Sequence, residues 1–235
     1  MKKTAVLFAL LAPTAALAQE ASLNLFTEIN RPYSYMEGER LSGHAVDFMK
    51  EALARSGVMA SMELTKWSRA ITLAEQQDNT CVFTTARTEE REEKFQWVGP
   101  MYTSSEYLLQ RVGSNTDVSS LEEALTKTIG TQAGDYTVQK LKKQGATNID
   151  LAADQSMTLK KLKAGRLDYA IVWGNAAAAA TESGELEVAM EASQTSVYLA
   201  CSKTTDAVLI EKLDRAIHSI VDDGTRDAFM SKYDQ

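Results

Sequence analysis

The first third of the chain alternates between the hydrophobic spacing of a strand and that of a helix. The pattern predicts strands at residues 22–27, 60–65 and 81–86 and helices at residues 45–56 and 69–76. Gly57 can end the first helix in a left-handed conformation, and Ser68 can cap the second. This β-α-β-α-β order predicts a mostly parallel sheet covered by helices.

The rest of the chain continues in the same way and predicts a second α/β lobe. The expected strands of this lobe are residues 107–112, 128–131, 149–151 and 167–173, and its expected helices are residues 121–125, 136–143, 156–164 and 176–181. The tail that follows predicts a strand at residues 197–202 and helices at residues 207–221 and 225–232. The sequence contains no internal repeat and no low-complexity linker.

Residues 1–18 have the features of a secretory signal peptide. A positive start at Lys2 and Lys3 precedes an apolar stretch, and the small-x-small sequence Ala16–Ala18 offers a cleavage site before Gln19. The apolar stretch is shorter than the roughly 20 residues that span a bilayer. Because no cysteine stands at the cleavage point, a lipid anchor is not expected. We therefore expect a periplasmic protein.

The charge balance limits the possible partners. The chain carries 25 Lys and Arg against 32 Asp and Glu, a net charge of −7, which becomes −9 without the two lysines of the signal. An acidic chain without a basic cluster is not expected to bind nucleic acid or an anionic membrane. The only histidines, His44 and His218, are far apart, so the sequence indicates no metal site and no cofactor.

The most informative motif follows the strand at residues 81–86. Residues 84–102 read TTARTEEREEKFQWVGPMY and include two arginines, Arg87 and Arg91. The guanidinium group has a planar set of donors that suits a carboxylate. The alternative is that both arginines are solvated among the four neighbouring glutamates, because charged side chains are mostly exposed.

This stretch resembles the T-x-E-R-x-x-x-F-x-[FW]-x-x-P-[YM] signature of the family 3 (polar amino-acid type) periplasmic solute-binding proteins of ABC importers. The resemblance implies a type II periplasmic-binding-protein fold, in which two α/β lobes are joined by two hinge crossings. Each lobe is then a mostly parallel sheet flanked by helices. It implies lobe I at residues 19–103 and 194–235 and lobe II at residues 104–193, with crossings near residues 102–105 and 192–195.

The same resemblance implies a function. A small anionic or zwitterionic solute is captured between the lobes and delivered to an ABC permease in the inner membrane, with no catalysis. We expect a monomer. Two alternatives have the same fold: a periplasmic enzyme similar to cyclohexadienyl dehydratase, and a sensory receptor for a membrane partner. The enzyme needs an acid or base in the cleft, and His44 and His218 lie on helices expected to be away from it.

Family positions in lobe I suggest part of the binding site. Arg91 matches the carboxylate-binding arginine. Arg87, four residues earlier, is either a second anion contact or a solvent-facing side chain. Thr84 and Thr85 lie near the strand end, where the family presents backbone groups and a hydroxyl, and Ala86 replaces a threonine that is common in amino-acid binders.

Aromatic residues and a glycine-containing loop complete the expected site. Trp67 matches an aromatic residue that stacks on the solute, and Tyr33 matches the loop after the first strand, although both rings could instead fill the core. Residues 130–137 resemble the family loop before a helix, where backbone N–H groups and the helix dipole suit an anion. Asp135 and Tyr136 lie in this loop, and Asp135 is expected mainly to cap the helix.

One departure from the family bears on the solute. Amino-acid binders place an ammonium-binding aspartate five residues beyond the position of Asp168, and this chain has Trp173 there. The missing contact is worth about 1.5–3 kcal/mol. Either Asp135, Glu28 or another acid replaces it, or the solute lacks an α-ammonium group. Trp173 could stack on an aromatic solute or on a cation.

The resemblance also bears on the two cysteines. In this fold Cys81 and Cys201 lie on neighbouring antiparallel strands away from the cleft, which predicts a disulfide in an oxidising compartment. The alternative is two buried free thiols.

Overall fold

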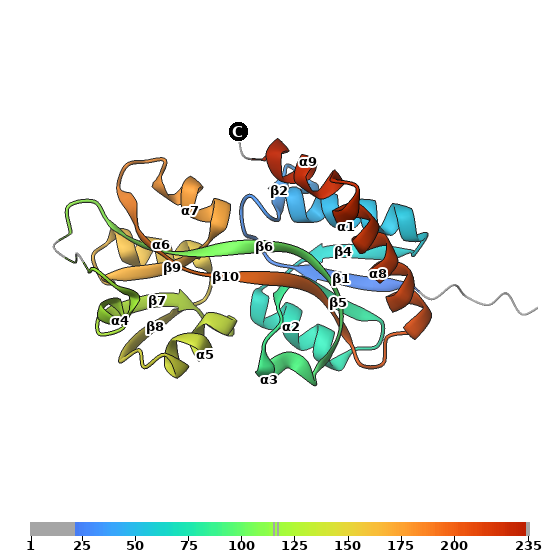
Figure 1. Cartoon of the computed structure of the whole chain (residues 1–235), viewed down its shortest axis with the longest axis horizontal. Helices are drawn as coiled ribbons and strands as arrows, with labels where there is room; N and C mark the ends of the chain where they lie inside the picture. Colours follow the sequence, from blue (N-terminus) through green and yellow to red (C-terminus); the bar gives the residue numbers. More distant parts are fainter. Residues whose placement is uncertain (1–21, 115, 117, 234–235) are drawn as a thin grey trace, which may run out of the picture.

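The structure is a computed structural model, and it describes residues 22–114, 116 and 118–233. The expected signal peptide, residues 1–18, lies outside the described residues. Two groups of helices lie at the two ends of an elongated molecule, and one sheet runs through both (Figure 1). No helix within the described residues is long and apolar enough to cross a bilayer.

In the described part of the chain, eight strands form the main sheet in the order β4-β1-β5-β10-β6-β9-β7-β8. Their bounds are β1 Leu23–Thr27, β4 Ala60–Leu64, β5 Thr80–Ala86, β6 Phe95–Arg111, β7 Thr128–Gln132, β8 Asn148–Ala152, β9 Tyr169–Trp173 and β10 Leu186–Ser202. Parallel pairs join β1 to β4 and β5, and β7 to β8 and β9, as the sequence predicts. A separate hairpin consists of β2 Tyr35–Glu37 and β3 Arg40–Ser42.

The helices cover the sheet in two groups. Their bounds are α1 His44–Ser56, α2 Trp67–Gln76, α3 Glu89–Glu92, α4 Leu121–Ala124, α5 Tyr136–Lys143, α6 Gln155–Lys163, α7 Gly174–Thr181, α8 Ala207–Asp222 and α9 Thr225–Lys232. We call the half with β1 to β5 and α1 to α3 lobe I, and the half with β7 to β9 and α4 to α7 lobe II. Helices α8 and α9 return to lobe I and pack on α1 (Figure 1).

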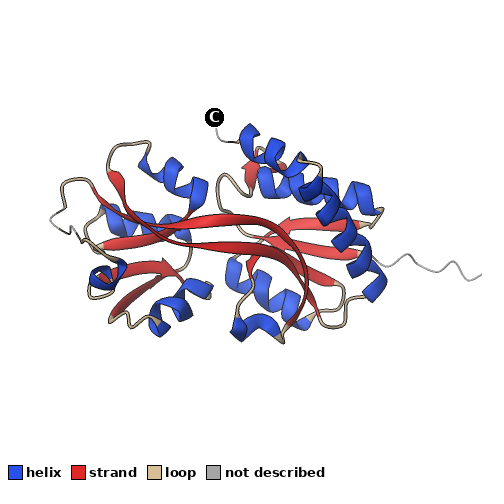
Figure 2. Cartoon of the chain, viewed as in Figure 1, coloured by secondary structure: helices blue, strands red, loops and turns tan. Residues whose placement is uncertain are grey.

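The connection between the lobes differs from the prediction. The sequence predicts short strands at residues 107–112 and 197–202, but β6 and β10 are 17 residues each and pair antiparallel through both lobes (Figure 2). Gly99 and Pro100 interrupt the sequence pattern, and β6 passes them at a register shift opposite residues 197–199. The expected crossings near residues 102–105 and 192–195 are therefore the middle of a paired ribbon. The predicted lobe boundaries stay a prediction.

A second difference concerns the start of α2. Ser68 was expected to cap a helix at residues 69–76, but α2 begins at Trp67, and Lys66 occupies the N-cap position without a side-chain hydrogen bond. The earlier start places the indole of Trp67 in the first helical turn, where it faces lobe II.

The disulfide prediction is confirmed. Cys81 of β5 and Cys201 of β10 are cross-strand neighbours and form a bond whose sulfur atoms are 2.05 Å apart. Both residues are fully buried in the largest apolar cluster, which continues along β6 and β10 into lobe II. The two lobes thus share one core at the ribbon.

Candidate functional site

The carboxyl ends of strands from both lobes meet at the centre of the molecule. In lobe I, β1 leads to Glu28 and β5 leads to Arg91. In lobe II, β7 leads to Asp135 and β9 ends at Trp173. Ligand sites of open α/β sheets lie at such strand ends.

The space at these strand ends consists of two adjoining cavities, which we call the outer and the inner compartment. The outer compartment holds seven of the nine sequence-predicted site residues, namely Tyr33, Trp67, Thr84, Arg91, Asp135, Tyr136 and Trp173. The inner compartment, in lobe II, is lined by polar residues that include Glu106, Thr131, Gln132, Thr137, Gln155 and Thr158. Glu28 and Asp135 line both compartments. Each compartment has a free volume of about 20 Å³, roughly the space of one water molecule.

Arg91 connects the two lobes from the short helix α3. Its Nη1 donates to the carbonyl of Ala86 at 3.2 Å, and its Nη2 donates to the carbonyl of Gly134 at 3.1 Å. Burial lowers the pKa of Arg91, and the negative charge of Asp135 opposes this shift. A guanidinium group has five N–H donors, so Arg91 keeps donors for an anion in the outer compartment.

The carbonyl of Gly134 also accepts a hydrogen bond from Trp67 Nε1 at 3.0 Å. The ring of Trp67 is 5.6 Å from Arg91 Cζ, within range of a cation–π contact. Gly134 has a φ of +78°, a left-handed conformation that favours glycine. The carbonyl of Gly134 in lobe II therefore accepts hydrogen bonds from two side chains of lobe I, those of Trp67 and Arg91.

Exposed ion pairs between α5 and α3 also join the two lobes, and we call them the rim ion pairs. Lys143, at the end of α5, lies 3.3 Å from a carboxylate oxygen of Glu89 and also pairs with Glu90 of α3. All three side chains are substantially exposed. These pairs cross from lobe II to lobe I, so they form only when the lobes are together.

Two carboxylates face the compartments from opposite lobes. Asp135 caps α5 as expected, accepting from Thr137 N at 2.8 Å and Thr137 Oγ1 at 2.7 Å, while burial raises its pKa. Glu28 accepts from Gln132 Nε2 across the lobes at 2.5 Å. Burial raises the pKa of Glu28 to about 8, although the bond from Gln132 partly opposes it.

Aromatic rings form the remaining walls. Tyr136 lies 5.4 Å from Trp173 between ring centroids. The hydroxyl of Tyr33 lies 2.9 Å from Ser104 Oγ on the ribbon. A Cβ at Gly174 would lie 2.5 Å from that hydroxyl, so the close approach of lobe II requires glycine there.

The two threonines at the end of β5 differ in position. Thr84 lines the outer compartment and has a φ of +63°, a strained conformation for a β-branched residue. Thr85 is fully buried, and its hydroxyl donates to the carbonyl of Val82 at 3.1 Å. The structure therefore places Thr85 outside the compartment.

Arg87 also lies outside it. Its Nε donates to Glu92 at 2.8 Å, and its Cζ is 5.7 Å from the ring centroids of both Trp97 and Tyr198. Of the two alternatives left open by the sequence, the geometry favours the exposed ion pair over a contact with the solute.

Some lining residues were missed by sequence reasoning. Glu106 belongs to a strand that was expected to begin only at residue 107, and it is fully buried beside the inner compartment. Gln132 ends β7 and binds Glu28. A single charged residue next to an apolar run was the one available signal for Glu106. The described residues contain no cluster of three or more His, Cys, Asp or Glu that could hold a metal ion.

The family model of the bacterial extracellular solute-binding proteins, family 3, matches residues 23–235. The chain belongs to this family, whose members are periplasmic or extracellular and bind small solutes. No curated protein matches the chain.

Solved structures of amino-acid-binding proteins have the same fold. An ancestral arginine-binding protein bound to arginine is 22% identical with a TM-score of 0.80, and the match covers 90% of this chain and 97% of that one. The arginine-, lysine-, histidine-binding protein ArtJ from Geobacillus stearothermophilus is 17% identical, with a TM-score of 0.79 and coverages of 91% and 95%. The ancestral amino acid-binding protein AncCDT-1, a precursor of cyclohexadienyl dehydratase, is 19% identical, with a TM-score of 0.79 and coverages of 91% and 95%.

Proposed function

We propose that this protein is a periplasmic receptor that binds a small carboxylate-bearing solute between its lobes and delivers it to an ABC importer. The observation that carries the proposal is the position of Arg91, which enters a compartment between the lobes with N–H donors to spare. Membership of the solute-binding family supports the receptor role.

The charges around Arg91 favour a zwitterion. Glu28 and Asp135 bring two carboxyl groups to the same compartment, and burial raises the pKa of both, so a cation beside them would favour their ionised forms. A solute whose carboxylate binds Arg91 and whose ammonium group lies near Asp135 and Glu28 satisfies both signs of charge. These acids would then replace the aspartate that is absent at Trp173. The arginine bound to the ancestral neighbour is a solute of this kind.

The lobes must separate for such a solute to enter, because each compartment has the size of about one water molecule. Separation breaks the interlobe bonds of Arg91, Trp67 and Glu28. A solute that contacts both lobes favours the closed arrangement and shifts the population toward it.

A ligand screen tests the proposal. Amino acids, dicarboxylates and aromatic acids are added to the pure protein, and the midpoint of thermal unfolding is measured. We expect a zwitterionic amino acid to raise the midpoint and Arg91→Ala to abolish the increase. Arg87→Ala, a matched change in the same segment but outside the compartment, should keep it. A stabilising solute that still acts on Arg91→Ala would remove Arg91 from this role.

An enzyme is the second candidate, favoured by one observation. A carboxyl group with a pKa of about 8 in a cavity can act as a general acid near neutral pH, and Glu28 has this property. The precursor relationship of AncCDT-1 shows that the fold can lead to a dehydratase. Turnover of a cyclohexadienyl acid by the pure protein, lost in Glu28→Gln, would support this alternative, and the absence of turnover would exclude that reaction.

A further inference from the structure

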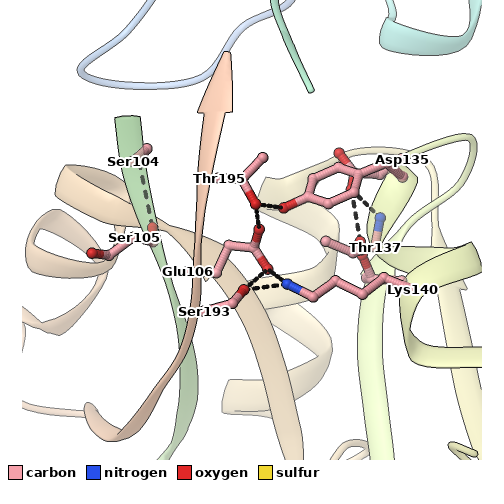
Figure 3. A network of polar contacts seen from close by, with 10 residues as sticks. Ser104, Ser105, Glu106, Asp135, Thr137, Lys140, Ser193 and Thr195 are labelled. Atoms are coloured by element: carbon pink, nitrogen blue, oxygen red, sulfur yellow. Dashed lines mark hydrogen bonds and ion pairs between the residues drawn. The ribbon is translucent and has the colours of Figure 1, made fainter. Parts of the chain in front are cut away.

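A buried carboxylate lies within the ribbon that joins the lobes. Glu106 of β6 is the cross-strand neighbour of Ser193 on β10 and of Trp173 on β9, and it is fully buried. Its carboxylate accepts hydrogen bonds from Lys140 Nζ at 2.9 Å, Ser193 Oγ at 2.9 Å and Thr195 Oγ1 at 2.8 Å (Figure 3). Burial of a charge is tolerated when it is paired and hydrogen-bonded in this way.

The local backbone of the ribbon aims these groups at Glu106. The pairing of β10 with β6 shifts register between Glu191 and Ser193, immediately before the two hydroxyl residues. Such irregularities redirect side chains. Ser193 and Thr195 are two positions apart on one strand, so they present their hydroxyls on the same face.

The other end of the network is helix α5. Tyr136 and Lys140 are one turn apart on this helix and so share a face. Lys140 pairs with Glu106, and the hydroxyl of Tyr136 donates to Thr195 Oγ1 at 2.9 Å. Lys140 also donates to Ser193 Oγ. Three polar contacts therefore attach α5 to the ribbon, and all of them lead to the same carboxylate.

This helix also carries part of the binding compartment. Asp135 caps α5 and lines both compartments, and Tyr136 lines the outer one. The position of these two residues depends on how α5 sits against β6 and β10. The contacts of Glu106 are directional hydrogen bonds, which fix an orientation more narrowly than apolar packing does.

We propose that Glu106 is a positioning residue for solute binding. It holds α5 on the ribbon and so sets where Asp135 and Tyr136 stand in the compartment. The proposal rests on the proposed function, because it takes the space between the lobes as the solute site. Nothing in it requires contact between Glu106 and the solute, although Glu106 borders the inner compartment.

Two variants test the proposal: one neutralises Glu106, and the other neutralises both Glu106 and Lys140. Glu106→Gln keeps the shape and an acceptor for Thr195, but the ammonium group of Lys140, which is 23% exposed, loses its carboxylate and keeps only the hydroxyl of Ser193. Breaking one side of a buried pair is costly, whereas neutralising both sides is often well tolerated. With L-arginine as the probe, we expect calorimetry to show affinity about tenfold weaker in Glu106→Gln. Affinity should return to within about threefold of the wild type in Glu106→Gln/Lys140→Met.

Hydrogen exchange provides a readout that needs no solute. Amides of residues 137–141, in α5, should exchange faster in Glu106→Gln and return to the wild-type rate in the double variant, while α8 stays unchanged. Thr195→Val, a milder change, removes the hydrogen bonds of Thr195 to Glu106 and to Tyr136 but keeps the Lys140–Glu106 pair, and it should speed the same amides. The matched control is Glu187→Gln, which alters another hydrogen bond between the same strands, from Gln110 Nε2 at 2.9 Å. It should change neither readout.

The outcomes are distinguishable. Unchanged exchange of α5 in Glu106→Gln overturns the proposal. If the double variant recovers wild-type exchange but not L-arginine affinity, Glu106 contacts the solute directly and the proposal is also wrong. If the wild type does not bind L-arginine or any other solute of the screen, the proposed function fails, and the exchange measurements alone decide whether Glu106 positions α5.

Discussion

Replacing Glu28 with glutamine tests the electrostatics of the cavity most directly. Burial raises the pKa of Glu28 from its ordinary value of 4.5 to about 8 in the folded protein. The folded state therefore holds this proton more tightly than the unfolded state does. Stability from this group is fully present below pH 4.5 and is lost as the pH rises toward 8.

The size of the effect follows from linkage. Each pH unit between the two pKa values costs about 1.4 kcal/mol of unfolding free energy. At pH 7, which is 2.5 units above 4.5, the upper limit is about 3.4 kcal/mol. In a chain of 235 residues this corresponds to roughly 7–14 °C in the unfolding midpoint. Glutamine cannot ionise and keeps an acceptor for Gln132, so Glu28→Gln should escape this loss.

Scanning calorimetry from pH 4.5 to 8.5 measures the prediction. The midpoint of Glu28→Gln minus that of the wild type should increase with pH and level off above pH 8. Glu63→Gln, on the exposed face of edge strand β4, is the matched control and should follow the wild type. A constant difference between Glu28→Gln and the wild type over this range would refute the burial of an ionisable carboxyl at this position.

A bound zwitterion should reverse the sign of the pH dependence that Glu28 gives to the unfolding free energy. An ammonium group beside Glu28 favours the ionised carboxylate, so binding releases the proton that the free protein holds at pH 7. Calorimetry with L-arginine in buffers of different ionisation enthalpy detects this release. Its absence would place the ammonium group away from Glu28.

Three further predictions concern other parts of the molecule. The disulfide closes a loop of 120 residues, so Cys81→Ala/Cys201→Ala should lose about 2–5 kcal/mol of unfolding free energy in urea titrations, and the reduced wild type should match it. Burial lowers the pKa of His44 to about 4, so stability present above pH 6.5 should fall by about 1.4 kcal/mol per pH unit on acidification toward 4, a loss absent from His44→Phe. Lys143→Glu reverses the rim ion pairs with α3 and should raise the dissociation rate of L-arginine about two- to fivefold at low salt, with no change in Lys142→Glu.

The sequence predicted local elements well because their signals are local. Helix α5 begins and ends at the predicted residues 136 and 143, since Asp135 caps it and its apolar side chains repeat at helical spacing. The long strands β6 and β10 were only partly predicted. They are paired with different neighbours along their length and change burial from one lobe to the other, so no single period describes them.

The candidate site divides in a similar way. Arg91 and Trp67 could be selected because they stand in or near a recognisable motif, and the structure places both at the junction of the lobes. Arg87 stands in the same motif, and only the three-dimensional positions of Glu92 and two aromatic rings direct it outward. Glu106 depends entirely on the register of three strands, which the sequence does not encode locally.

With Trp173 at the end of β9, the acidic groups of the cavity come from other elements. With no acid at the end of β9, the carboxylates face the compartment from the start of α5 and from the end of β1, one in each lobe. A cation between Asp135 and Glu28 would bridge the lobes, whereas a cation held at the end of β9 would be bound by lobe II alone. Since closure is favoured only by contacts that differ between the open and closed forms, an ammonium group bound between Asp135 and Glu28 would contribute to closure as well as to affinity.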